Sequence, residues 1–235
     1  MGLVSAFFYL AGAQITPIEA LNIALLDAEP VPSMRAAFRA SISSSGAVRE
    51  IEYDPLKPLS RRFRISRRVG VDEELDAIVD DWAREVQPDV RLFADDLRSS
   101  LGQGNIVQTA DGWNVQFQHK LSNNDGPVDA LVSQQMVGGL NLDANTGLLS
   151  RLEYSINKPF KTPEGAWVDS YRQVYSFGRS EQWGVTFVTG YDLYARGGRF
   201  GVKGERTFSV KVTDVAFSLA SDANQQLESK RIPTN

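Results

Sequence analysis

The sequence contains no cysteine and a single histidine, His119. The lack of cysteine excludes disulfides, thiolate nucleophiles and every metal site that is ligated by cysteine. A single histidine excludes metal sites built from several histidines. Most of the side chains from which metal centres and nucleophilic active sites are made are therefore missing, and we expect neither a metal nor another cofactor.

A strong excess of charge of either sign is also missing. The 25 lysines and arginines and the 29 acidic residues give a formal net charge of −4 over 235 residues. This balance produces no general attraction to nucleic acid or to an anionic membrane, although it still allows local basic patches. We expect no nucleic-acid partner.

The chain has no apolar run long enough to cross a bilayer as a stable helix. The apolar run at residues 3–10 is followed by Ala11, Gly12 and Ala13, which have the small-x-small form of a signal cleavage site. No lysine or arginine precedes the run, and a buried N-terminal strand or short helix is the alternative. We expect residues 1–13 to be a signal peptide cleaved near Ala13, and the mature protein to be periplasmic or secreted.

Helical periodicity is strongest over residues 72–87. Asp72 can cap this helix, and its apolar residues fall on one stripe: Leu75, Ile78, Val79, Trp82 and Val86. The pattern also predicts a helix over 15–27, a weaker helix over 89–101 that ends at Gly102, and a short helix over 129–135. Residues 72–101 are thus expected to form a helical insertion between strands.

Alternation of apolar and polar residues is abundant, above all over residues 148–219. Successive side chains of a strand point to opposite faces, so this alternation gives each strand one apolar face. Turn residues such as Asp111 and Gly112 separate the strands and predict hairpins. The predicted strands cover residues 34–43, 48–53, 61–66, 106–110, 113–118, 137–143, 148–158, 167–177, 183–194 and 205–219, with a glycine-rich loop over 196–204.

The last predicted strand changes phase. Phe208, Val210 and Val212 occupy even positions, whereas Val215 and Phe217 occupy odd positions. Because a shift of one residue moves side chains to the other face, we expect a β-bulge or bend near Thr213 and Asp214.

Together these patterns predict an α+β fold. It consists of a strongly curved antiparallel β-sheet of about ten strands with helices that cover its concave face. We find no low-complexity linker, so we expect one domain over residues 14–219, followed by a polar tail over 220–235.

Catalytic candidates are few. His119 is in phase with Trp113, Val115 and Phe117, which favours a histidine at the wet end of a core-facing row over a general base. Asp80 with Asp81, and Asp95 with Asp96, are neighbours that point about 100° apart on a helix, so neither pair makes a shared carboxylate site by itself. We expect no catalytic residue among them.

Two groups of cations stand out. Arg196, Arg199, Lys203 and Arg206 surround the glycine-rich loop, which lacks the spacing and the strand–helix context of a phosphate-binding loop. A second group lies over residues 61–68. Solvated surface is the simpler interpretation of both, and a rim that meets anionic lipid head groups or an acidic partner is the alternative.

Residues 137–154 (VGGLNLDANTGLLSRLEY), followed by Asn157, Lys158, Pro159 and Phe160, resemble the later strands of the periplasmic lipoprotein-carrier (LolA/LolB-like) superfamily. The order of export signal, helix, strands, helical insertion and further strands is similar as well. The resemblance implies an unclosed barrel whose open side is covered by helices and whose cavity holds acyl chains. No ligand-binding residue of that superfamily carries over to a position of this sequence.

Our first functional hypothesis is an exported, non-enzymatic protein that binds a lipid or other acyl ligand, or a lipidated partner protein, between sheet and helices. The candidate apolar lining is Trp82, Phe187, Tyr191, Phe208 and Val210. One alternative is an envelope scaffold or interaction protein with a filled core. The other is a hydrolase that works through a pair of carboxylates, which would have to converge inside the sheet.

Overall fold

The protein is an eleven-stranded antiparallel β-sheet with helices on one side, as seen in a computed structural model that describes residues 16–29, 34–84, 92, 97, 101–109, 111–120, 127–143, 145–162 and 165–219. The predicted signal peptide and polar tail lie outside the described residues. The strands are β1 (Met34–Ser44), β2 (Ala47–Tyr53), β3 (Phe63–Val69), β4 (Leu101–Thr109), β5 (Gly112–His119), β6 (Met136–Asp143), β7 (Leu149–Ile156), β8 (Phe160–Lys161), β9 (Ala166–Ser180), β10 (Val185–Arg199) and β11 (Val202–Leu219). The helical elements are α1 (Pro17–Asp27), η1 (Leu59–Arg61), α2 (Glu73–Arg84) and α4 (Pro127–Gln135).

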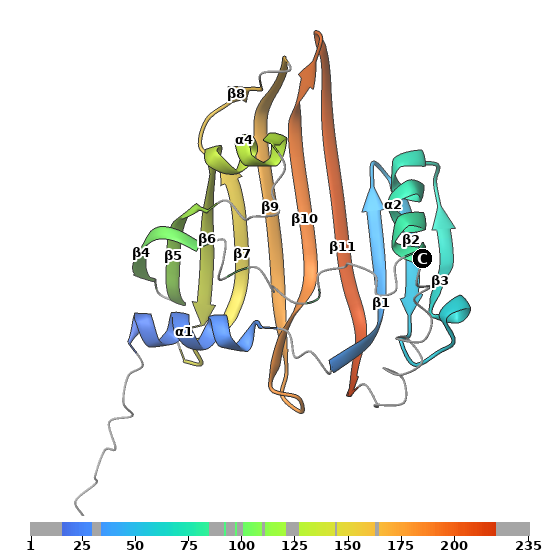
Figure 1. Ribbon diagram of the computed structural model, residues 1–235, viewed down its shortest axis with the longest axis horizontal. Helices are drawn as coiled ribbons and strands as arrows, with labels where there is room; N and C mark the ends of the chain where they lie inside the picture. The colour runs from blue at the N-terminus through green and yellow to red at the C-terminus, as the bar shows by residue number, and fades with distance from the viewer. Residues whose placement is uncertain are drawn as a thin grey trace, which may run out of the picture.

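The strand order is β3-β2-β1-β11-β10-β9-β7-β6-β5-β4, with β8 added alongside β9. Two meanders, β1–β3 and β4–β11, are joined where β11 pairs with β1 (Figure 1). The sheet is curved and unclosed, with β3 and β4 at its two edges. This confirms the predicted α+β fold with an open antiparallel sheet.

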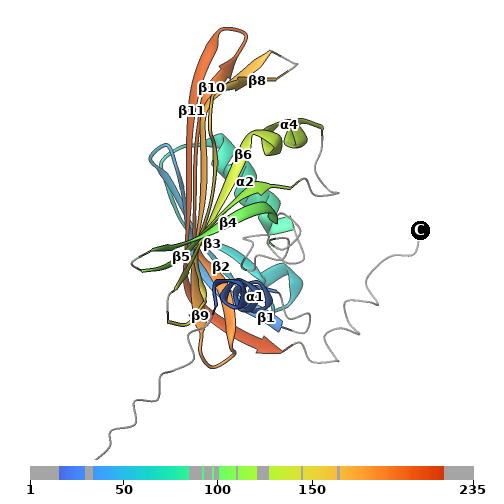
Figure 2. The same ribbon diagram turned by 90° about the vertical axis from the view of Figure 1, so that its left-hand side faces the viewer.

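The described helices α1, α2 and α4 lie on the same side of the sheet (Figure 2). We call this side the helix face and the opposite side the outer face. Helix α1 lies within the range predicted for it. Thr16 caps it, Pro17 opens the first turn, and the Glu19 carboxylate accepts hydrogen bonds from both the backbone N–H and the hydroxyl of Thr16. At its other end, Asp27 pairs with Arg179 of β9 and Thr186 of β10, which ties the helix to the sheet.

The predicted hairpins and bulge are confirmed. Ser45 and Gly46, both with positive φ, form the turn between β1 and β2. On β11 the pairing with β1 shifts register between Ala37 and Arg39, opposite Asp214, whose φ is +50°. The extra residue moves the apolar side chains from even to odd positions, so both halves of β11 keep an apolar row toward the core.

Two sequence predictions are wrong. Residues 196–204 do not form a loop, because β10 and β11 stay paired up to Arg199 and Val202, leaving only Phe200 and Gly201 as the turn. Gly102 does not end a helix, because β4 already begins at Leu101. In both places glycines lie in closely paired backbone: a Cβ at Gly102 would lie 2.4 Å from the carbonyl oxygen of Gln118. Most of residues 89–100, where the weaker helix was predicted, lies outside the described residues.

The connection from β3 to β4 has to pass from one edge of the sheet to the other. Helix α2 begins this crossing beside β2 and β3 (Figure 1). Farther along, the carbonyl oxygen of Leu92 accepts a hydrogen bond of 2.7 Å from the backbone N–H of Val188 on β10. This bond falls where a register shift between Val188 and Gly190 disrupts the pairing of β10 with β9. A local irregularity of the strand thus holds the crossing segment against the middle of the sheet.

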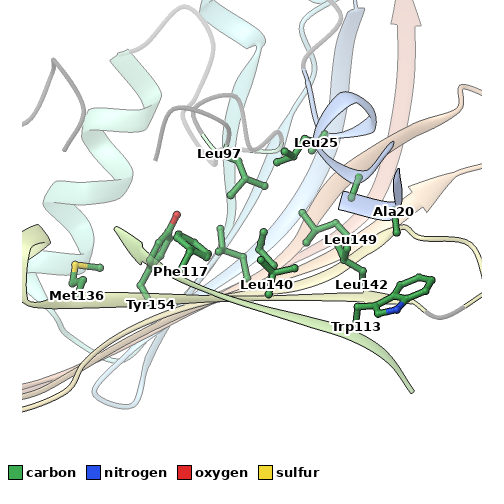
Figure 3. Packing of buried hydrophobic residues seen from close by; sticks show 14 residues of the cluster. Ala20, Leu25, Leu97, Trp113, Phe117, Met136, Leu140, Leu142, Leu149 and Tyr154 are labelled. Carbon is green, nitrogen blue, oxygen red and sulfur yellow. The ribbon is translucent and has the colours of Figure 1, made fainter. Parts of the chain in front are cut away.

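The buried apolar residues of the helix face form two clusters. The α1 cluster joins α1 to β5, β6 and β7. In Figure 3, Ala20, Leu25 and Leu97 lie above Leu140, Leu142 and Leu149. The α2 cluster joins α2 to the other half of the sheet and comprises Ala36, Phe38, Ala40, Ile42, Ala47, Ile51, Tyr53, Leu75, Val79, Leu92, Phe208, Val210 and Val212. Leu75 and Val79 confirm that the predicted stripe of α2 faces the sheet, whereas Val86 lies outside the described residues.

Candidate ligand-binding face

Helix α2 is fixed to the sheet by a buried ion pair as well as by its apolar stripe. Arg49 of β2 is 1% exposed and points to the helix face, where its guanidinium donates hydrogen bonds of 2.7 and 3.0 Å to the carboxylate of Asp76. The same guanidinium donates to the carbonyl oxygens of Val48 and Val69. These hydrogen bonds from Arg49 hold the pKa of Asp76 below its usual value, and the carboxylate raises the pKa of Arg49. Asp76 thus fixes α2 to β2 of the sheet.

Four of the five candidate lining residues come together at the α2 cluster. Phe208 and Val210 of β11 are 8% and 6% exposed, and Tyr191 of β10 lies opposite Val210 in the register. The rings of Tyr191 and Phe208 are 6.0 Å apart. Trp82 of α2 packs against the same cluster from the helix side. These side chains thus come from the sheet and from the helix that covers it.

Phe187 lies apart from the other four candidates. It precedes the register shift of β10 and packs edge-on against Phe217 of β11, with ring centroids 5.3 Å apart. Phe217 belongs to the partly buried residues around the α2 cluster. Phe187 is not a member of either cluster. Its neighbours on β10 face the helices, since Thr186 bonds Asp27 of α1 and Val188 lies opposite Phe177, so Phe187 points away from them and reaches the α2 cluster only through Phe217.

Half-buried aromatic side chains connect the two clusters across β9, β10 and β11. We call Tyr175, Phe177, Tyr191 and Phe217 the aromatic seam. Tyr175 and Phe177 pack against the α1 cluster, while Tyr191 and Phe217 pack against the α2 cluster. The rings of Tyr175 and Tyr191 are 4.9 Å apart and bridge the two. Of the seam, the sequence analysis named only Tyr191 as a lining residue. The other members were missed, although the alternation of Tyr171, Tyr175 and Phe177 along β9 was a signal for them.

The seam also carries a polar line on β9. The hydroxyl of Tyr171 donates to the side-chain oxygen of Gln173 at 3.1 Å, and the amide of Gln173 donates to the hydroxyl of Tyr175 at 2.7 Å. An apolar surface with a few fixed hydrogen-bonding groups is typical of small-molecule binding sites.

The outer face of the sheet has two hollows. The larger, about 1040 Å³, lies over β4–β7, and its lining includes Gln103, Asn105, Asn114, Gln116, Gln118 and Asn141. The smaller, about 430 Å³, lies between the β1–β2 turn and the strands β9–β11, beside Arg172 and Asp192. The larger hollow also contains Arg151 and Glu153, and Arg151 together with Arg172 holds the carboxylate of Glu153. Hydrogen bonds from Arg172 and then Arg151 lower the pKa of Glu153.

The catalytic candidates of the sequence lie at separate places. His119 ends β5, half-buried, with its ring 5.1 Å from that of Tyr154. Asp80 pairs with Arg68 and Asp81 with Arg84 on the surface of α2, while Asp95 and Asp96 lie outside the described residues. Among the residues that the structure describes, no three histidine or acidic side chains gather to hold a metal ion, and no helix is long and apolar enough to cross a membrane.

No protein-family model matches this sequence, and no curated protein matches it in sequence. The fold is similar to that of a LolA superfamily protein from Nitrosomonas europaea, with 9% identity and a TM-score of 0.37 over 88% of this chain and 94% of that one. It is also similar to MucB in complex with MucA(peri), with 9% identity and a TM-score of 0.22 over 88% of this chain and all of that one. A third similar structure is the Pseudomonas aeruginosa MucA/MucB complex, with 9% identity and a TM-score of 0.25 over 87% of this chain and 99% of that one. At this level the likeness is a weak resemblance of overall fold.

Proposed function

We propose that the protein is a non-enzymatic binding protein that takes an apolar ligand, such as an acyl chain or a lipidated partner, on its helix face. The observation that carries the proposal is the aromatic seam. Its rings lie half-buried between two well-packed clusters. Fully burying a large apolar side chain contributes about 1.5–3 kcal/mol, and a ligand that covers the exposed part of these rings gains part of that free energy. Trp82, Tyr191, Phe208 and Val210 are the proposed apolar lining, and Phe187 lies beside it at Phe217.

The described parts of the crossing segment lie over the helix face beside the seam. The stripe of α2 packs in the α2 cluster, the carbonyl oxygen of Leu92 accepts a hydrogen bond from Val188, and Leu97 packs in the α1 cluster. We propose that a ligand rests on Tyr191 and Tyr175, beside these residues. Export after cleavage near Ala13 would place the protein where lipids and lipidated proteins are its neighbours, and N-terminal sequencing of the periplasmic fraction tests this part.

Native mass spectrometry of the purified protein is the first test, and we expect a co-purifying acyl species. Titration with a fluorescent fatty acid then compares two tyrosines of β10. Tyr191→Ala, on the helix face, is expected to weaken binding about tenfold or more. Tyr194→Ala, three residues along β10 and on the outer face opposite Thr207, is the matched control and should bind as the parent does. Absence of any acyl species together with no binding of the probe would contradict the proposal.

The larger outer hollow favours a second candidate, an envelope interaction protein. Its amide side chains offer both donors and acceptors to a polar partner. A photo-reactive residue placed at Gln116 or Asn141 would test for a partner protein at this hollow. Capture of a partner there, by a protein that binds no acyl probe, would support this second candidate over the first.

A further inference from the structure

The turn between β10 and β11 combines exposure, charge and backbone strain in one place. We call Arg199, Phe200, Gly201, Val202 and Lys203 the hairpin tip. It projects past the ends of the neighbouring strands, far from α1 (Figures 1 and 2). Phe200 is 79% exposed and Val202 is 72% exposed. Two large apolar side chains thus stand in water at the most outlying part of the sheet.

The backbone at the tip is unusual for its sequence. Phe200 has φ +51° and Gly201 has φ +82°, and the flanking Arg199 and Val202 are paired. A two-residue turn with positive φ at both positions is normally made by Asn-Gly or Gly-Gly, because a bulky side chain is strained there. Phenylalanine at this position costs stability, and strained residues of this kind concentrate at functional sites.

The strands below the tip approach one another closely. A Cβ at Gly198 would lie 2.1 Å from the carbonyl oxygen of Val202 and 2.4 Å from the ring of Trp167, so glycine is required for the strands to approach this closely. Trp167 itself sits on β9 opposite Gly198. Phe200 is therefore presented at the end of three closely paired strands, with most of its side chain exposed.

The four cations near the turn divide into two kinds. Arg206 pairs with Glu74 of α2 at 2.9 Å, and Arg196 lies 4.0 Å from Asp169. Arg199 and Lys203, by contrast, form no ion pair with any of the described residues, and the guanidinium of Arg199 lies 4.7 Å from the centre of the Phe200 ring. The two uncompensated cations thus flank the exposed aromatic residue.

We propose that the hairpin tip docks the protein on an anionic lipid surface, with Phe200 and Val202 entering the head-group region and Arg199 and Lys203 facing lipid phosphates. Aromatic rings favour the membrane–water interface, and long basic side chains keep their charge in the head groups while their stems lie along apolar surface. Each basic residue near an anionic membrane strengthens binding about fivefold. The proposal rests on the tip alone and is independent of the ligand on the helix face.

Co-sedimentation with two kinds of vesicle tests the proposal. The anionic vesicles contain equal parts of phosphatidylglycerol and phosphatidylcholine, and the neutral vesicles contain phosphatidylcholine alone. We expect the full chain to sediment with the anionic vesicles and to be released in about 1 M salt, where charges are screened within about 3 Å. Phe200→Asn suits positive φ, so the turn is retained while binding falls about tenfold or more. Neutralising Lys203 as Lys203→Gln should lower binding about fivefold.

Val71→Asn is the matched control, because Val71 is 94% exposed but lies between β3 and α2, away from the tip. It should bind as the parent does. A second readout uses the absence of cysteine: an environment-sensitive dye on Val202→Cys should shift to the blue with anionic vesicles. Equal sedimentation of the parent and Phe200→Asn would overturn the proposal. No sedimentation of either would also overturn it, and would favour an acidic protein as the partner of the two cations.

Discussion

At the scale of single residues, neighbouring glycines on β6 have opposite surroundings. A Cβ at Gly138 would lie 2.1 Å from the ring of Phe117, whereas one at Gly139 would meet nothing within 4 Å. Gly138 faces the α1 cluster and Gly139 faces the outer hollow. The first glycine is needed to seat an aromatic ring, and the second leaves space.

These surroundings predict opposite effects of the same substitution. Gly138→Ala must displace Phe117 and should lower the free energy of unfolding by about 1–3 kcal/mol. Gly139→Ala should leave it unchanged or raise it by up to about 1 kcal/mol, because alanine restricts the unfolded chain. Urea denaturation of both variants checks this, and equal destabilisation would contradict the assigned faces.

At the scale of elements, the position of α2 depends on Asp76 and Arg49. The pKa of Asp76 is lowered by Arg49, so its folded value lies below the unfolded value of about 3.9. A carboxyl of this kind stabilises the fold above its unfolded pKa, and the contribution is lost as pH falls through its folded pKa. The N-cap Asp72 acts in the same direction, since the backbone N–H of Leu75 lowers its pKa.

We therefore expect the thermal midpoint to fall as pH is lowered from about 5 toward 2. The thermal midpoint of Asp76→Asn should be lower than that of the parent at pH 7, and it should change less as the pH is lowered. Asp81→Asn, on the exposed side of the same helix, should follow the parent. Thermal unfolding followed by circular dichroism over this pH range is the measurement, and parallel curves for parent and Asp76→Asn would contradict the role of the ion pair.

Beyond the fold class, the features that could be predicted from the sequence were local. The turns at Ser45 and at Asp111, the cap at Thr16 and the bulge at Asp214 are each set by a few adjacent residues, and all are observed. Arg49 could not be assigned, because an arginine in an alternating strand suggests solvent until its partner on α2 is known. The aromatic seam was hidden for the same reason, since it depends on which distant strands lie side by side.

At the scale of the whole molecule, β11 joins the two meanders. It pairs with β1 from Met34 opposite Leu219 to Ser44 opposite Phe208, and with β10 on its other side. The α2 cluster draws Phe208, Val210 and Val212 from this strand. Without β11 the two halves of the sheet share no strand pairing among the described residues.

A chain that ends after Gly201 should therefore fail to fold cooperatively, whereas one that ends after Leu219 should keep the parental midpoint. The first truncation removes a central strand, and the second removes only residues that follow the sheet. Circular dichroism and denaturant titration compare the two. A cooperative transition in the shorter chain would show that the meanders are stable independently.

The central place of β11 also bears on how the chain acquires its structure. The strand that joins the two meanders follows every other described strand in the sequence, so β1 has to wait for a partner more than 160 residues away. Contacts of such long separation form slowly, and the two halves of the sheet cannot be joined until β11 has been synthesised. Until then the edge of β1 that β11 will cover stays unpaired, and an unpaired strand edge can pair with another chain.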